Sequence, residues 1–133
     1  RFIGGPLSKI LQGRMNKRRT GTRMEEIAAS WLEKQGGRIL EHSYRGAGAE
    51  IDLIYEEGQT LVFAEVKYRS SGRYGSPAEA VDDRKRRRIV QAAALYAQRQ
   101  GRLSDAIRFD VIEMVQIEGR LYIRQLKAAF IPE

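Results

Sequence analysis

Residues Thr60 to Arg69 restrict the fold of this chain most, because they place apolar side chains on both faces of one extended segment. Side chains alternate between the two faces of a strand, so Leu61 and Phe63 point to one side while Val62 and Ala64 point to the other. A strand that is apolar on both faces needs a covering layer on each side. We therefore expect this segment to be a central strand of a sheet that is covered on both faces.

The rest of the pattern predicts two helices and four further strands. Ile27, Ala28, Trp31 and Leu32 recur at helical spacing after Thr22, and Gly36-Gly37 is expected to end that helix. A second helix is predicted from Ser76-Pro77-Ala78-Glu79, with Ser76 as N-cap and Pro77 at the first helical position, to about Gln100, with Gly101 as its stop. The further strands are expected at Arg38–Tyr44, Glu50–Tyr55, Arg108–Val115 and Leu121–Leu126.

These elements follow in the order α-β-β-β-α-β-β, which predicts the α/β class with a mixed central sheet flanked by helices. A chain of 133 residues with 42% hydrophobic content supports one compact core. We expect residues 1–20 to be a basic tail and residues 21–133 to be a single domain. Met15 is the expected natural start, and residues 1–14 are then an upstream extension or an addition made for expression.

Composition narrows the classes of function. The chain has no cysteine, which excludes a disulfide framework, a thiolate zinc site and a thiol nucleophile. Its apolar runs are far below the roughly 20 residues that span a bilayer, so we expect a soluble protein with no membrane partner, and the lack of a secretory signal pattern favours the cytoplasm. The formal charge of +7 indicates a polyanionic partner. The excess is local, since residues 1–24 carry seven bases and no acid, and a solvated arm is the alternative interpretation.

The feature that indicates chemistry is Glu65-Val66-Lys67 in the third strand, preceded by Asp52 in the second. Residues two apart on a strand point to the same face, roughly 6.6 Å apart. If Glu57-Gly58 is a hairpin turn, counting back from it brings Asp52 close to opposite Glu65. Two converging carboxylates suit Mg²⁺, which accepts substrate phosphate as a further ligand, and an ammonium such as Lys67 can orient an attacking water or stabilise a phosphorane-like transition state.

Each of these residues has a structural alternative. Glu65 and Lys67 could form a surface ion pair, and Asp52 could be a charge that protects an edge strand. Against this, unpaired charges are costly in the most apolar strand of the chain. Thr22-Arg23-Met24-Glu25 has the pattern of a capping box, so Glu25 could bond to the N-cap amide or lean towards the metal as a third acidic group.

Arg84 to Arg88 form a run of five consecutive bases, which would wrap around a helix and not line one stripe. One interpretation is a solvated turn of helix, partly offset by upstream acids. The other is a set of phosphate contacts for a nucleic acid. His42 has no evident partner for a catalytic triad or a metal, so we expect it to be a surface residue.

Together these residues resemble the YraN-like family of uncharacterised bacterial proteins. That family is similar to archaeal Holliday-junction resolvases and is predicted to have the PD-(D/E)-x-K nuclease fold. The resemblance covers about Gly21 to Leu126. It is carried by Gly21, Glu25-x-x-Ala28, Trp31-Leu32, Ser43-Tyr44-Arg45, Glu50 to Ile54, Leu61 to Arg69, Val81 to Lys85 and Arg108 to Val111.

The resemblance implies a single restriction-endonuclease-like domain in which Asp52 and Glu65 hold Mg²⁺ or Mn²⁺. It further implies that Lys67 is the motif lysine, that Glu25 is the catalytic glutamate of the first helix, and that Glu50 supports the site. The candidate nucleic-acid contacts are Arg45, Arg69, Lys85, Arg86 and Arg88. Ser43 stands where asparagine is common in the family, and Met24 and Ala49 stand where glycine is common.

The leading functional hypothesis is therefore a metal-dependent endonuclease that hydrolyses phosphodiester bonds in branched or structured DNA. The alternative is a non-catalytic nucleic-acid-binding module that keeps the nuclease fold. Pairing of exposed strand edges could make a homodimer.

Overall fold

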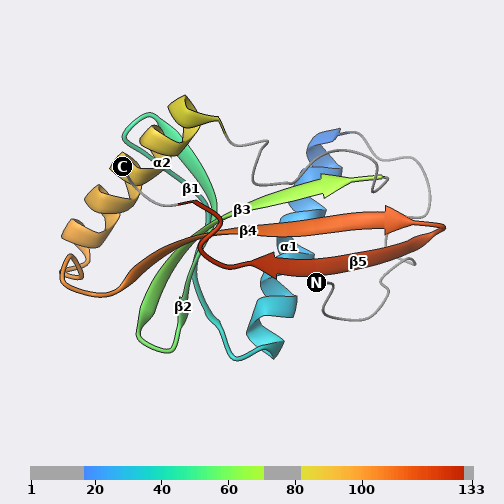
Figure 1. Cartoon of the computed structure of the whole chain (residues 1–133), viewed down its shortest axis with the longest axis horizontal. Coiled ribbons are helices and arrows are strands. Elements are labelled where there is room, and N and C mark those ends of the chain that lie inside the picture. Colours follow the sequence, from blue (N-terminus) through green and yellow to red (C-terminus); the bar gives the residue numbers. More distant parts are fainter. Residues whose placement is uncertain (1–16, 71–81, 131–133) are drawn as a thin grey trace.

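In the computed structural model, which describes residues 17–70 and 82–130, five strands form one sheet in the order β1-β2-β3-β4-β5 (Figure 1). β3 and β4 run parallel, and every other neighbouring pair is antiparallel, so the predicted mixed sheet is confirmed. The elements are α1 (Lys17–Lys34), β1 (Arg38–Gly46), β2 (Ala49–Glu57), β3 (Thr60–Arg69), α2 (Asp83–Arg99), β4 (Ile107–Ile117) and β5 (Arg120–Leu126). The strand bounds differ from the predicted ones by a few residues, except for β3, which matches.

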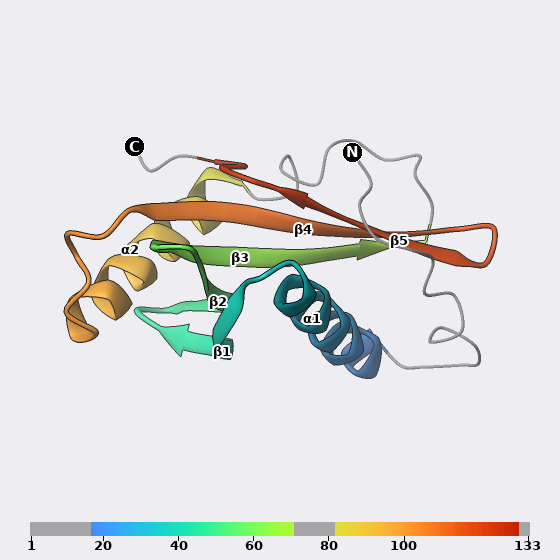
Figure 2. The same ribbon diagram turned by 90° about the horizontal axis from the view of Figure 1, so that it is seen from below.

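β3 lies between β2 and β4, and its two faces contact different helices. Val62 and Ala64 pack in the cluster that α1 covers, whereas Leu61 and Phe63 pack in the cluster that α2 covers. The prediction of a central strand covered on both faces is therefore confirmed. Figure 2 shows α1 lying under β3 and β4.

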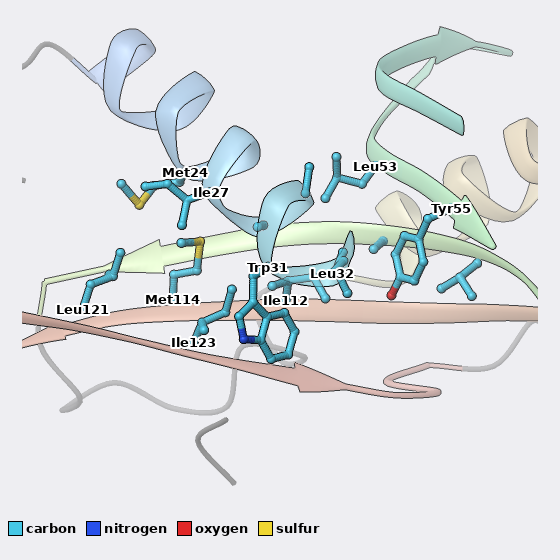
Figure 3. Packing of buried hydrophobic residues seen from close by; sticks show 14 residues of the cluster. Met24, Ile27, Trp31, Leu32, Leu53, Tyr55, Ile112, Met114, Leu121 and Ile123 are labelled. Atoms are coloured by element: carbon cyan, nitrogen blue, oxygen red, sulfur yellow. The ribbon is translucent and has the colours of Figure 1, made fainter. Parts of the chain in front are cut away.

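The α1 layer is built by the apolar stripe that the sequence pattern indicated. Trp31 and Leu32 lie against the sheet residues Ile112, Met114 and Ile123 (Figure 3). Leu32, Ile112, Met114 and Ile123 are almost completely buried, and full burial of an aliphatic side chain of this size contributes about 1.5–3 kcal/mol. This packing fixes where the polar face of α1 points.

The beginning of each helix corrects a prediction. α1 begins at Lys17, so Thr22 lies inside the helix and cannot be its N-cap. The amide groups near Thr22 already follow a helical turn, and the proposed capping box is wrong.

No described helix is long and apolar enough to cross a membrane.

α2 begins at Asp83, with Asp82 as N-cap in an extended conformation (φ −72°, ψ 169°). The Asp82 side chain accepts a hydrogen bond of 2.8 Å from the backbone N–H of Lys85. A continuous helix from Pro77 to Gln100 is therefore wrong, and the expected start at Ser76–Glu79 lies outside the described residues. The predicted stop is confirmed, since Gly101 follows the helix with φ +68°.

Candidate active site

The β2–β3 ladder stops in the middle of both strands. Pairing runs from the turn, at Glu57 and Thr60, only as far as Leu53 and Ala64. β2 continues from there as far as Ala49, paired with β1 alone. In Figure 2 the β1–β2 hairpin leaves the plane of β3 and β4. We call the point where the strands separate, between Asp52 on β2 and Glu65 on β3, the fork.

Asp52 and Glu65 take the positions where the next pair of the ladder would stand, as counting back from the turn predicts. Each carboxylate accepts a backbone hydrogen bond from the opposite strand. Val66 N–H donates to Asp52 Oδ2 at 2.8 Å, and Asp52 N–H donates to Glu65 Oε2 at 3.3 Å. Buried backbone N–H groups need such partners. The two carboxylates therefore replace the missing backbone pairing and are held at the fork by it.

The charged form of Asp52 is disfavoured at the fork. Burial, together with the charge of Glu65, raises the pKa of Asp52 to about 7. Glu65 is itself only 3% exposed. A cation placed between two such carboxylates would relieve the repulsion.

Two lysines approach the fork from different elements. Lys67, on the same face of β3 as Glu65, has its pKa lowered by burial and by the neighbouring Lys85. Lys85, on the first turn of α2, places Nζ 3.0 Å from Glu65 Oε1. Burial acts to lower the pKa of Lys85, but Glu65 outweighs it, so the pKa is raised. The structure therefore places Lys85 on a carboxylate, whereas the resemblance implied a phosphate contact.

Glu25 reaches the fork from α1, which covers the face of the sheet opposite to the one that α2 covers. The Ser43 hydroxyl of β1 donates a hydrogen bond of 2.8 Å to Glu25 Oε1. Burial raises the pKa of Glu25, and the charges of Glu50 and Glu65 act in the same direction. Of the two interpretations of Glu25, the structure contradicts the cap and places the carboxylate among the acidic residues of the site.

A cleft of about 560 Å³ opens at the fork. It contains Glu25, Asp52, Glu65 and Lys67, so the structure brings the four predicted catalytic residues together. Arg84 also lines it and was missing from the individual candidates, although it belongs to the same basic run. The lining residues are Glu25, Gly48, Ala49, Glu50, Asp52, Glu65, Val66, Lys67, Asp82, Arg84, Lys85, Arg88 and Ile89.

The other predicted basic contacts lie elsewhere or hold structural partners. Arg45 is exposed and pairs with Glu50 at 3.3 Å. Arg69 pairs with the buried carboxylate of Glu113 on β4, and the Arg86 guanidinium lies 5.6 Å from the ring centroid of Phe130. Lys85 and Arg88 are the candidates for nucleic-acid contact that line the cleft.

The donor set at the fork fits a hard divalent cation. Mg²⁺ is bound in proteins by one or two carboxylates and completes its shell with water and substrate phosphate, and Asp52 and Glu65 offer two carboxylates of this kind. Within the described residues, no three His, Cys, Asp or Glu side chains form a group that could hold a metal by themselves. An ion held by Asp52 and Glu65 would complete its shell with water or with a bound anion.

Comparison with known sequences shows which protein family the residues of the fork belong to. The model of the uncharacterised protein family UPF0102 matches residues 24–114, which include both strands of the fork and the first turn of α2. The chain belongs to this family. The YraN-like resemblance of the sequence is thereby confirmed.

UPF0102 proteins of several bacteria are similar over most of their length. The one from Anaeromyxobacter dehalogenans is 42% identical over 110 residues, which cover 83% of this chain and 82% of that protein. The one from Symbiobacterium thermophilum is 44% identical over 114 residues, covering 85% and 97%. The one from Chromohalobacter salexigens is 41% identical over 115 residues, covering 86% and 93%.

Proposed function

We propose that this UPF0102 protein is a metal-dependent endonuclease that hydrolyses phosphodiester bonds in DNA, with branched or otherwise structured DNA as its substrate. The observation that carries the proposal is the pair of backbone hydrogen bonds that holds Asp52 and Glu65 together at the fork. The buried Glu65 and the part-buried Asp52 lie close together, and Lys85 pairs with Glu65 alone. A divalent ion bound between the two carboxylates would stabilise the charged form of both.

Asp52 and Glu65 would hold Mg²⁺ or Mn²⁺. When bound, such an ion neutralises charge that develops on a phosphate and lowers the pKa of an attacking water. Lys67 lies next to Glu65 on the same strand face, where its amine can orient that water or stabilise the negative charge of the transition state. Glu25, held by Ser43, adds negative charge that attracts the cation.

The basic residues of the cleft support a polyanionic substrate. Arg84, Lys85 and Arg88 line the same cleft as the two carboxylates, so a backbone phosphate could contact them and still reach the fork. Contacts with phosphate position a nucleic acid without reading its sequence. The preference for branched or structured DNA rests on the family resemblance.

A non-catalytic nucleic-acid-binding module remains the second candidate. The ion pair of Lys85 with Glu65 favours it, since an internal ammonium already neutralises one carboxylate. The two candidates differ in their dependence on metal, because both would bind nucleic acid in a salt-sensitive way.

The test is cleavage of labelled single-stranded, duplex, flap and four-way-junction DNA, and of RNA, with Mg²⁺ or Mn²⁺. We expect the wild type to cut one DNA structure and Glu65→Gln and Lys67→Met to lose about a hundredfold or more in rate. Glu33→Gln, a change at an exposed position of α1 outside the cleft, is the control and should cut normally. If the wild type binds DNA but cuts none of the substrates, the binding module takes the place of the nuclease.

A further inference from the structure

Lys85 holds the oxygen of Glu65 that a metal ion would need. Glu65 Oε2 already accepts the backbone N–H of Asp52, 3.3 Å away. Each carboxylate oxygen has a second lone pair, but Oε1 is the one that does not hold the Asp52 amide, and the Lys85 ammonium lies 3.0 Å from it. A divalent ion and the Lys85 ammonium would repel each other if both were bound to Oε1, so they compete for this oxygen.

The Lys85 side chain can leave without disturbing the helix. Its backbone N–H is fixed by the Asp82 cap, and its side chain lines the cleft and is 41% exposed. Lysine has a long flexible stem and a strongly hydrated ammonium. Rotation of this stem would move the charge from Glu65 to the open part of the cleft.

The position of Lys85 on α2 favours contact between the released ammonium and an anion. Arg84 and Lys85 lie in the first turn of α2, where the helix dipole disfavours positive charge. The same end of a helix favours phosphate. Departures from a local rule concentrate at functional sites, and a phosphate in the cleft would stabilise both side chains.

We propose that Lys85 is an exchangeable counter-ion, which neutralises Glu65 in the metal-free protein and moves to a phosphate of the nucleic acid when a divalent ion binds. The identity of the ion and of the anion rests on the proposed function. Metal binding then frees a phosphate contact, and phosphate binding removes a competitor of the metal. Because linkage is reciprocal, each ligand tightens the binding of the other by the same factor.

The first test measures the affinity for Mn²⁺ from the EPR signal of the free ion, without DNA and at pH 8. Lys85→Met keeps the stem without the charge and should bind Mn²⁺ at least about fivefold more tightly, a factor at the low end of coupling between sites. Lys85→Gln is a second neutral variant, in case Lys85→Met does not fold, as judged by circular dichroism. Arg88→Met removes a charge from the same cleft but leaves the Lys85–Glu65 ion pair in place, and should change the affinity much less.

The second test measures binding of a fluorescein-labelled DNA duplex by anisotropy, with EDTA and with Ca²⁺, at constant ionic strength. The factor by which Ca²⁺ tightens binding should fall towards one in Lys85→Met and Lys85→Gln. Arg88→Met should weaken binding under both conditions and keep the wild-type factor. Lys85 variants that fold but gain no Mn²⁺ affinity, or keep the coupling factor, overturn the exchange while leaving the metal site intact. If the wild type binds no Mn²⁺, or Glu65→Gln binds it equally well, the metal site fails and the exchange fails with it.

Discussion

The Ser43 hydroxyl donates a hydrogen bond of 2.8 Å to Glu25, and it does so from a backbone conformation that serine rarely adopts. Ser43 has φ +48° in the middle of β1. The β1–β2 register pairs His42 with Leu53 and Tyr44 with Ile51, so Ser43 stands opposite Asp52. The left-handed residue on the edge strand therefore lies directly beside the fork on the neighbouring strand.

Substitutions at Ser43 should test the left-handed backbone and the hydrogen bond to Glu25 together. A left-handed conformation costs a residue with a Cβ about 1–2 kcal/mol, and β-branched residues tolerate it worst. We expect Ser43→Val to lower the free energy of unfolding by at least about 2 kcal/mol, and Ser43→Asn to leave it equal or higher. Urea denaturation measures both. His42→Val, on the same strand, should change it little, and equal stability of the Ser43→Val protein would contradict the assignment.

The pKa of Asp52 makes stability depend on pH. It is raised from its ordinary 3.8 to about 7 by burial and by Glu65, so the folded protein binds this proton more tightly than the unfolded chain. Its contribution to stability is then complete below about pH 4 and is lost as the pH rises towards 7. Between these values we expect the wild type to lose a few kcal/mol relative to Asp52→Asn, in urea titrations at each pH. Parallel pH profiles of the two proteins would refute the shift.

Metal binding should show the opposite dependence on pH. A divalent ion needs ionised carboxylates and so competes with the proton on Asp52. Mn²⁺ affinity should therefore weaken as the pH falls below about 7, by up to tenfold per pH unit. A pH-independent affinity measured by EPR would place the ion away from the fork.

Glu25 and its neighbour Glu26 provide a matched pair on α1. Glu25 lines the cleft, whereas Glu26 is exposed outside it. Glu25→Gln removes a negative charge close to Asp52 and Glu65, and we expect Mn²⁺ affinity to fall about tenfold, the size typical of residues that support a metal site. Glu26→Gln should bind Mn²⁺ like the wild type. If the two variants bind Mn²⁺ with equal affinity, Glu25 is not part of the metal site.

The buried polar cluster around Tyr55 tests a part of the fold that does not line the cleft. The Tyr55 hydroxyl donates to Asp110 at 2.7 Å and accepts from Gln125 at 3.0 Å. Tyr55→Phe should lower the free energy of unfolding by about 1.5–3 kcal/mol, as for hydrogen bonds to charged groups. Tyr68→Phe removes a part-buried hydrogen bond to the neutral Gln116 and should cost less. A larger loss in Tyr68→Phe would contradict this ranking.

The sequence sufficed for features that depend on alternation and counting. The two apolar faces of β3 follow from the period of a strand, and Asp52 falls opposite Glu65 because the turn at Glu57-Gly58 fixes the register. Lys85 was different. Five consecutive basic residues point in all directions around a helix. Which of them contacts Glu65 depends on how Ile89 and the rest of the apolar face of α2 pack against the sheet. That rotation is a tertiary property without a signature in the basic run.

The beginnings of the helices were missed for a related reason. Thr22-Arg23-Met24-Glu25 carries a capping pattern, yet α1 begins upstream of Thr22, and α2 is capped by Asp82, which the sequence pattern did not single out. A capping pattern contributes only about 1 kcal/mol, so it does not by itself decide where a helix begins. The same short pattern therefore occurs inside α1 without marking its first turn.

Asp52 and Glu65 are part of the architecture of the sheet as well as of its chemistry, and this affects how natural selection acts on them. Each satisfies a main-chain N–H that the parted strands leave behind. Under the proposed function, a lineage that no longer needed catalysis would still lose stability on replacing either acid with an apolar residue. The acids would therefore outlast the proposed activity, and its loss would be recognised first by changes at Lys67 or Lys85, whose ammonium groups accept no hydrogen bond from the backbone.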